Sequence, residues 1–283
     1  MALRDALKQS VAPGEAAIQN GLRKWSSPMS SLARAPSDRP AFLLVITPLL
    51  ILLAHAAAVL PHEFGHSFMA WALGIKSDPL EIRWGGTSLA NMLLLVHIDE
   101  NVDYSAALHA GKNWQVALAA FAGPGLANGG LYLASRWTLA KRPSRSPLAT
   151  WCLFWFLFMN LANLFDYVPI RTFSPWDDVA HFRWATGVSP WVVYIIGGYA
   201  VLAAIIDFYR RVLPLSLNAT GLDQPVQRAG ILLIVTMLLF GYFAIPGFHV
   251  PDDVSHVIAG TSIMSIPLVL WATFPSIIVR PGR

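Results

Sequence analysis

The sequence predicts an all-α polytopic membrane protein with about six transmembrane helices and a small β-hairpin or re-entrant sheet after the first helix. Of its 283 residues, 55% are hydrophobic and only 13% are charged, whereas soluble domains carry about 25% charged residues. Six apolar runs approach the roughly 20 residues that a helix needs to cross a bilayer. Short β-prone pieces between turn residues follow the first of these runs.

The apolar runs follow a polar tail, residues 1–40, which is rich in proline and serine. We expect this tail to be mostly disordered. Residues 41–185 are expected to form a core of three helices, and residues 186–283 three further helices. The six predicted spans are 41–73, 114–135, 148–165, 190–207, 229–246 and 257–279.

Residues 74–113 do not have the composition of a simple loop. The pieces "PLEIRWGG" and "MLLLVHID" are β-prone and too short to span a membrane. Non-helical backbone at membrane depth must be surrounded by protein or water. We therefore expect a β-element over residues 80–98, packed beside the first helix.

Lysine and arginine are unequally divided between the two sides of the predicted spans. Fifteen lie in the tail, in the 136–147 and 208–228 loops and at the C-terminus, and five lie in the other three loops. The positive-inside rule then places both termini in the cytoplasm. Topology also explains the net charge of +4, so the lipid bilayer, and no nucleic acid, is the expected partner. The single cysteine, Cys152, excludes an intramolecular disulfide.

The first predicted span contains the motif H-E-x-x-H, formed by His62, Glu63 and His66. Positions i and i+4 share a helix face, so both imidazoles can bind one metal ion. Ionisable groups in a bilayer cost roughly 2.5 to 3.5 kcal/mol each on insertion scales, so the motif indicates function. A catalytic zinc needs a third protein ligand and one position for water, whose pKa falls to about 7. Glu63 then suits a general base.

Other polar residues offer supporting roles. His55, seven residues before His62, is predicted to be a packed, hydrogen-bonded histidine rather than a fourth ligand. "FAGPGLANGG", residues 121–130, falls inside the second span, where small residues favour close helix packing and Asn128 can hydrogen-bond a strand or an extended substrate. The end of the third span, residues 160–182, offers four candidates for a third metal ligand: Asp166, Asp177, Asp178 and His181.

In chain order, these three features resemble the site-2 protease family of intramembrane zinc metalloproteases. "HEFGH" matches the first motif of the family intact. "GPGLAN" matches its second motif, with one more residue between Pro124 and Asn128 than is usual. "NLFDYVPIRTFSPWDD" has the asparagine and proline of its third motif but lacks the compact L-D-G ending, because the aspartates follow an insertion. The resemblance covers about residues 41–185.

The resemblance implies an enzyme that hydrolyses a peptide bond in or near a transmembrane segment of a membrane-protein substrate. Zn²⁺ is the implied cofactor and Glu63 the implied catalytic residue. The implied zinc ligands are His62, His66 and Asp178, with Asp177 as the alternative to Asp178. The implied supporting residues are Gly123, Pro124, Asn128 and Asn163.

Two further expectations concern the substrate and the orientation of the site. Residues 82–98 are a candidate strand for pairing with an unwound substrate. In bacterial members of the family the zinc lies nearer the cytosolic face, whereas the charge distribution places the Gly74 end of the first helix on the opposite side. An inverted orientation and a re-entrant segment that misleads the charge count are both compatible with the sequence.

Other classes of membrane protein fit the sequence less well. A membrane diiron oxygenase needs about eight histidines in several boxes, but the eight histidines here are scattered and no H-x-x-H-H occurs. A transporter is disfavoured because the last three spans contain few charged residues. A catalytically inactive relative that acts as a scaffold binding membrane proteins is the main alternative, and the intact Glu63 argues against it.

Overall fold

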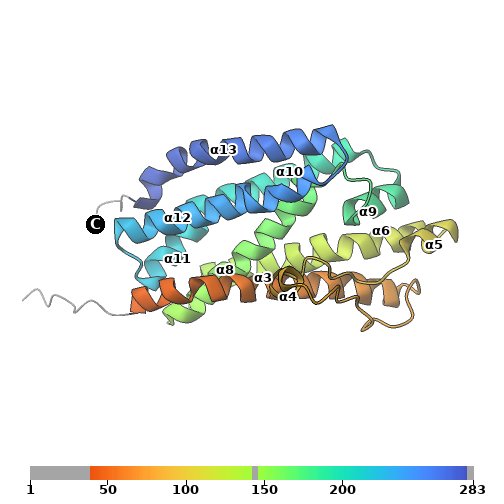
Figure 1. Cartoon of the computed structure of the whole chain (residues 1–283), viewed down its shortest axis with the longest axis horizontal. Coiled ribbons are helices and arrows are strands. Elements are labelled where there is room, and N and C mark those ends of the chain that lie inside the picture. The colour runs from red at the N-terminus through yellow and green to blue at the C-terminus, as the bar shows by residue number, and fades with distance from the viewer. Residues whose placement is uncertain (1–38, 142–145, 279–283) are drawn as a thin grey trace, which may run out of the picture. The chain divides into compact units, whose positions relative to one another are not determined.

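A computed structural model of the chain describes residues 39–141 and 146–278, and the described residues from Pro40 onward form one compact unit (Figure 1). The predicted tail, residues 1–40, lies outside the described residues except for its last two. The elements are α3 (Arg39–Ala72), α4 (Leu89–Leu94), α5 (Tyr104–His109), α6 (Asn113–Phe121), η1 (Ala122–Gly129), α7 (Gly130–Lys141), α8 (Pro147–Phe165), η2 (Asp166–Ile170), α9 (Asp178–Thr186), α10 (Pro190–Asp207), η3 (Phe208–Val212), α11 (Leu213–Thr220), α12 (Pro225–Phe240), η4 (Tyr242–Phe248) and α13 (Asp253–Ile278).

Six helical stretches are long and apolar enough to cross a membrane, which confirms the prediction of six such helices. They are Pro40–Ala72, Asn113–Lys141, Pro147–Ile170, Pro190–Thr220, Pro225–Phe248 and Asp253–Ile278. All but the first are longer than predicted, the fourth most of all, because the π-helical turn η3 joins α10 to α11. The turn η1 likewise joins α6 to α7 within the second stretch. The architecture fits a multi-pass membrane protein. The division into residues 41–185 and 186–283 stays a prediction.

Helix α8 forms the centre of the unit. It runs obliquely between α3 and α6 on one side and α12 on the other (Figure 1). Trp151, Phe154 and Phe158 of α8 are fully buried, and the ring of Phe154 stacks on that of Phe208 in η3 at 5.7 Å between centroids. Such aromatic pairs bury large apolar areas and fix the positions of the helices they join. The C-terminal end of α8 is therefore a rigid base for the loop that follows η2.

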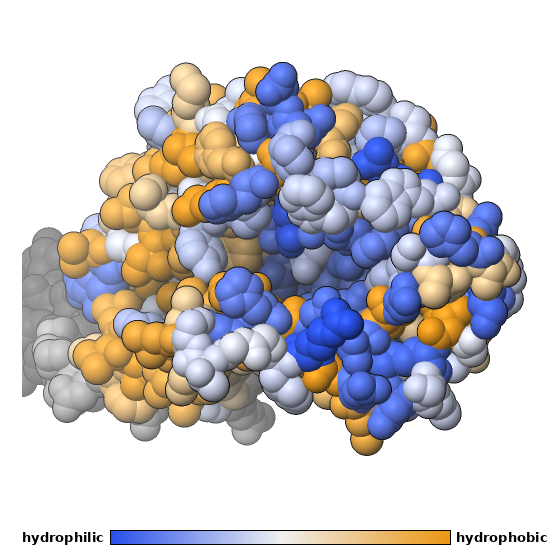
Figure 2. Space-filling view, turned by 45° about the vertical axis from the view of Figure 1, so that its right-hand side comes forward, coloured by the Kyte–Doolittle hydropathy of each residue, from blue (hydrophilic) through white to orange (hydrophobic). Residues whose placement is uncertain are grey.

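The two ends of the helical unit differ in character. The start of α3 and the end of α13 lie at one end, and α5 and α9 lie at the other (Figure 1). At the end with α5 and α9, hydrophilic side chains surround a hollow, while apolar side chains gather on the adjacent flank (Figure 2). The compartment that each end faces stays a prediction.

The β-hairpin predicted over residues 80–98 does not form. Within the described part of the chain no strand occurs, and this segment contains only one antiparallel bridge, between Arg83 and Asp99. Ser88 instead caps the short helix α4 by accepting a hydrogen bond from the backbone amide of Asn91 at 3.2 Å. The strand that was expected to pair with a substrate over residues 82–98 is therefore absent from the described structure.

The side chain of Asn91 explains why a compact turn replaces the hairpin. Its Nδ2 donates to the carbonyl oxygens of Trp84 and Gly86, both at 2.7 Å, and its Oδ1 accepts from the amide of His97 at 2.9 Å. Backbone groups that a β-ladder would pair are thus satisfied by one buried side chain.

The segment around α4 nevertheless folds back along α3. His55 donates from Nε2 to the carbonyl oxygen of Leu94 at 2.8 Å, which makes it a packed, hydrogen-bonded histidine. His55 lies 17 residues before Ala72, which corresponds to about 25 Å along a helix. The chain after α3 therefore folds back to the middle of that helix, and the exposed side chains of Leu89 and Met92 suit an apolar surrounding.

We predict that Asn91→Ala loosens the segment around α4, residues 84–98. The substitution removes three hydrogen bonds to backbone groups, and each such bond contributes about 0.5 to 1.5 kcal/mol. Hydrogen exchange of the amides of residues 84–98, followed by mass spectrometry, should show at least tenfold faster exchange. Met92→Ala is the matched control, because this exposed side chain lies on the same helix and its loss should leave exchange unchanged. Equal exchange in both variants would contradict the role given to Asn91.

Candidate metal centre

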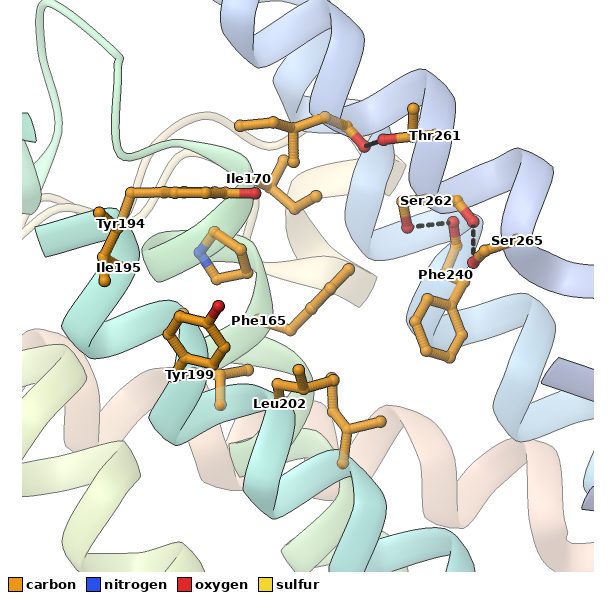
Figure 3. Close-up of a pocket in the computed structure, with 15 residues that line it drawn as sticks. Phe165, Ile170, Tyr194, Ile195, Tyr199, Leu202, Phe240, Thr261, Ser262 and Ser265 are labelled. Carbon is orange, nitrogen blue, oxygen red and sulfur yellow. Dashed lines mark hydrogen bonds between the residues drawn. The ribbon is translucent and has the colours of Figure 1, made fainter. Parts of the chain in front are cut away.

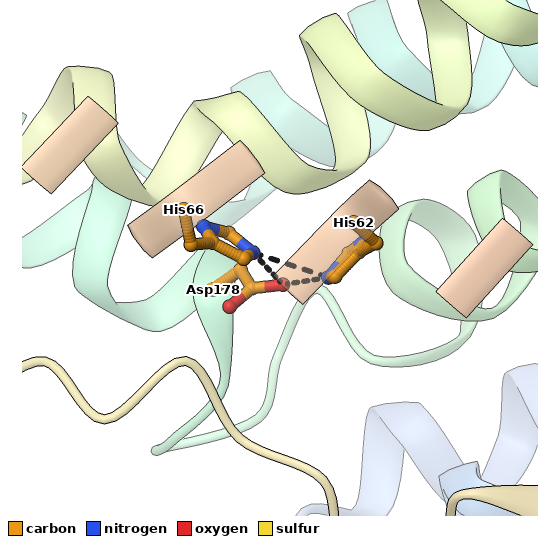
Figure 4. Close-up of side chains that lie close together, drawn as sticks. All are labelled: His62, His66 and Asp178. Atoms are coloured by element: carbon orange, nitrogen blue, oxygen red, sulfur yellow. Dashed lines mark hydrogen bonds and ion pairs between the residues drawn. The ribbon is translucent and has the colours of Figure 1, made fainter. Parts of the chain in front are cut away.

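The two histidines of the H-E-x-x-H motif lie on one face of α3 and point toward Asp178 at the start of α9 (Figure 4). All three side chains are buried. His62 Nε2 lies 3.0 Å from Asp178 Oδ2, His66 Nε2 lies 3.2 Å from the same oxygen, and the two Nε2 atoms lie 3.1 Å apart. Among the described residues, this is the only group of three or more histidine, cysteine or acidic side chains placed to hold a metal ion.

Hydrogen bonds on the far side of each ring determine which nitrogens face the centre of this group. His62 Nδ1 lies 2.6 Å from Asn128 Oδ1, and His66 Nδ1 lies 2.7 Å from the carbonyl oxygen of Ala119. Oxygen atoms of these types only accept, so each Nδ1 donates. Each Nε2 is then the unprotonated nitrogen of a neutral imidazole, which is the form that binds metals.

The amide of Asn128 is itself oriented by two other groups. Its Nδ2 donates to the carbonyl oxygen of Ala58 and to Asn160 Oδ1, both at 3.0 Å. Asn160 in turn donates from Nδ2 to the carbonyl oxygen of Phe156 at 2.8 Å. This series of bonds leaves only Oδ1 of Asn128 to face His62, so η1 and α8 together fix the tautomer of a residue on α3.

The three inward-facing atoms form a set that a cation would complete. Two imidazole nitrogens and one carboxylate oxygen, all lone-pair acceptors, lie within 3.2 Å of one another. A tetrahedral zinc ion with bonds of about 2.0 to 2.1 Å separates its ligand atoms by about 3.3 Å. The observed triangle is close to one face of such a tetrahedron, so the residues fit a three-ligand zinc site with one position left over.

The charge state of Asp178 agrees with this assignment. Burial by itself would raise the pKa of Asp178, but the two histidine side chains that face it outweigh this effect and hold the pKa well below its usual range. The carboxyl group is therefore an anion, as a metal ligand must be.

The other candidates for the third ligand are held elsewhere. Arg171 pairs with Asp166 at 2.8 Å and with Asp177 at 3.4 Å. The ring of His181 packs against Tyr104 at 4.3 Å between centroids, and burial lowers the pKa of His181. None of these three belongs to the group around Asp178.

Asp177 has an unusual backbone conformation, with φ 81° and ψ 171°. This region is essentially restricted to glycine, and a residue held there stores about 1 to 3 kcal/mol of strain. The strain lies one residue before the third member of the metal group. The turn into α9 is therefore maintained by the surrounding contacts and not by local preference.

Glu63 lies beside the metal group and faces a cavity of about 500 Å³. It is buried, with 6% of its surface exposed, and makes no hydrogen bond or ion pair with another described residue. Asn163 also lines the cavity, and its Nδ2 has no partner among the described residues. These polar groups can bind water or a peptide, and His62 of the metal group lines the same cavity. Further polar residues around the cavity are His55, Asp166, Tyr167 and Arg171.

Gly123 and Pro124 lie in the π-helical turn η1, beside His66. A Cβ atom on Gly123 would overlap the imidazole of His66, so only glycine leaves room for this ring. A π turn contains one residue more than an α turn. It therefore accommodates the additional residue before Asn128 and returns that side chain to the face of the helix that meets His62.

On its other side the metal group borders an apolar groove of about 570 Å³. Of the described residues that line it, Asp178 alone is charged. Exposed apolar side chains from three helices form its rim, including Phe121, Leu133, Val192 and Ile196. The metal group thus lies between a cavity with polar walls and an apolar groove.

A third cavity, of about 420 Å³, lies between α10, α12 and α13 (Figure 3). The hydroxyl groups of Thr261, Ser262 and Ser265 that face it already donate to backbone carbonyl oxygens. This cavity offers neither metal ligands nor carboxylates, so the chemistry of the molecule concentrates at the group on α3 and α9.

Sequence reasoning missed three residues that support the metal group. Asn160, not Asn163, orients Asn128. Tyr167 stacks on the ring of His62 at 4.5 Å between centroids, and the guanidinium carbon of Arg171 lies 4.0 Å from the centre of the Tyr167 ring. The only signal for them in the sequence is a run of polar residues at the end of an apolar span.

Comparison of the chain with models of known protein families, with curated proteins and with solved structures finds no match.

We predict that the purified full chain in detergent contains about one zinc ion, and that His62→Ala and Asp178→Ala both lose it. His181→Ala is the control, because His181 lies near the group but outside it, and this variant should retain its zinc. Metal analysis by mass spectrometry, performed without chelators, measures the ratio of zinc to protein. Zinc retained in Asp178→Ala, or absent from the unmodified chain, would contradict the assignment.

We further predict that Gly123→Ala reduces zinc content by at least tenfold, because the added methyl group displaces the ring of His66. Gly130→Ala is the matched control. It is seven residues further along the same helical stretch, and nothing lies within 4 Å of an added Cβ there. The control should keep its zinc, since glycine to alanine in a helix is worth only about 0.5 to 1 kcal/mol in its favour. Equal zinc content in the two variants would refute the steric argument.

Proposed function

We propose that the protein is an intramembrane zinc metalloprotease of the site-2 protease type, which hydrolyses a peptide bond in or near a transmembrane segment of a membrane-protein substrate. The observation that carries this proposal is the buried His62–His66–Asp178 group beside Glu63. Both histidines and Glu63 lie in a helix apolar enough to span a membrane. Ionisable groups in that position are costly and are usually retained for function.

The chemistry divides between a metal ion and the residues around it. Zinc held by the three side chains would supply a Lewis acid that polarises the substrate carbonyl and increases the acidity of water. Glu63 has no hydrogen-bond or ion-pair partner among the described residues, and it takes a proton from the attacking water. It then delivers this proton to the nitrogen of the leaving amine, so that water adds across the peptide bond and no other reactant is needed.

The two spaces beside the metal group suit the two reactants. The cavity that contains Glu63 has polar walls and supports access of water. The groove on the other side is apolar and borders Asp178, which supports access of a transmembrane segment from the lipid. A hydrolytic site in a membrane requires both routes, because water is scarce in the hydrocarbon layer.

The depth of the site favours cleavage toward one end of the substrate segment. His66 lies six residues before the end of α3, which corresponds to about 9 Å along the helix axis. A substrate helix near its end needs only a few broken hydrogen bonds to expose a carbonyl group. We therefore propose that the scissile bond lies within about two turns of the end of the substrate's transmembrane helix.

Glu63→Gln tests the proposed reaction. We expect this variant to keep its zinc, because Glu63 is not a member of the metal group, and to lose at least 100-fold in cleavage, the usual contribution of a general base. The measurement is mass-spectrometric mapping of new N-termini in membranes of cells that express the unmodified chain or the variant.

The control is Glu81→Gln, which changes an exposed carboxylate in the loop after α3 and should cleave as the unmodified chain does. We expect new N-termini in or near transmembrane segments with the unmodified chain and with Glu81→Gln. These N-termini should be absent with Glu63→Gln. A zinc-loaded chain that produces no such termini in any form would refute proteolysis and favour the catalytically inactive scaffold.

A further inference from the structure

The loop between η2 and α9, residues 171–177, begins with a half-buried arginine, Arg171, whose contacts lead to two members of the metal group. Arg171 has 17% of its side chain exposed. It pairs with Asp166 and Asp177, and its guanidinium carbon lies 4.0 Å from the centre of the Tyr167 ring.

One of these contacts leads to His62. Tyr167 is stacked between Arg171 on one side and His62 on the other, with 4.5 Å between the centroids of the two rings and an angle of 27°. A cation over an aromatic face is an attractive arrangement, and more so where water is excluded. Arg171 therefore limits the tilt of the ring that carries one metal-facing nitrogen.

The other contact leads to Asp178. Asp177, the ion-pair partner of Arg171, directly precedes Asp178 and has the strained φ of 81°. Its carbonyl oxygen accepts from the amide of His181 in the first turn of α9 at 3.1 Å. The ion pair thus opposes relaxation of Asp177, and relaxation would move the carboxylate of Asp178 away from the histidines.

We propose that Arg171 is a positioning residue of the metal centre, which holds His62 through Tyr167 and Asp178 through Asp177. This inference rests on the metal site of the proposed function but not on proteolysis. The loop is the insertion that distinguishes this chain from the compact third motif of the family, so the insertion contains its own means of placing the ligand.

A second arginine in the same region provides a matched control. Arg183 donates to the carbonyl oxygens of Thr172 and Ser174 at 2.9 and 3.3 Å. It stabilises the same loop, and its hydrogen bonds to the described residues do not include Tyr167, Asp177 or a member of the metal group. A purely structural effect on the loop should therefore be shared by variants of both arginines, and an effect on the metal should be specific to Arg171.

The test compares Arg171→Met and Arg171→Lys with Arg183→Met and Arg183→Lys, as full chains in detergent. Zinc affinity is measured by competition with a chromophoric chelator, and the ligand geometry by the visible spectrum of the cobalt(II)-loaded protein. We expect Arg171→Met to bind zinc roughly 10- to 100-fold more weakly, as loss of a residue that supports a ligand does, and to change the cobalt spectrum. Arg171→Lys should give an intermediate loss, because lysine keeps the charge but not the planar fork.

The Arg183 variants should keep the affinity and the spectrum of the unmodified chain. If Arg171→Met does not fold, the lysine variants decide the question in the same way. Unchanged affinity and spectrum in the folded Arg171 variants, or an equal loss in the Arg183 variants, would overturn the proposal. Absence of zinc from the unmodified chain would refute the metal centre itself, whereas zinc binding without proteolysis would refute only the proposed function.

Discussion

The convergence of three lone-pair atoms in a buried position is the constraint on which the rest of the site depends. Two neutral imidazole nitrogens and a carboxylate oxygen repel one another unless a cation or a proton lies between them. Their outer hydrogen bonds, to Asn128 and to the backbone of Ala119, prevent the rings from turning a donor inward. The arrangement is therefore preorganised for a positive ion, and much of the surrounding structure serves to maintain it.

The means of maintaining it come from four parts of the chain. Helix α3 supplies the spacing of the two histidines, and the loop before α9 supplies the carboxylate of Asp178. The turn η1 supplies the amide of Asn128 and the space that Gly123 leaves beside His66, and α8 orients that amide through Asn160. The aromatic packing of α8 makes it a stable reference for the other three parts. The π-helical turn η1 changes the direction of the side chains that follow it, and in this way it places Asn128 opposite His62.

Helix periodicity was sufficient to predict the spans and the shared face of His62 and His66, because both depend only on residues close in sequence. The choice of Asp178 over Asp177 was not predictable in this way, since it depends on an ion pair between Asp177 and Arg171. Asn160 and Asn163 lie three residues apart on α8, and which of them meets Asn128 depends on how η1 and α8 pack. The β-hairpin was mispredicted because the apolar, β-prone run after Gly86 contains Asn91, whose side chain replaces a ladder with local bonds.

The series of hydrogen bonds from Phe156 through Asn160 and Asn128 to His62 crosses three membrane-spanning stretches. The tautomer of His62 is therefore decided only after these stretches have packed together. Metal affinity and helix assembly are then thermodynamically linked: an ion present at 1,000 times its dissociation constant adds about 4 kcal/mol to the stability of the packed state. Binding of an ion at this group would thus distinguish correctly packed chains from the rest, because chains whose helices have not packed correctly would lack both the site and the stabilisation that an ion would provide.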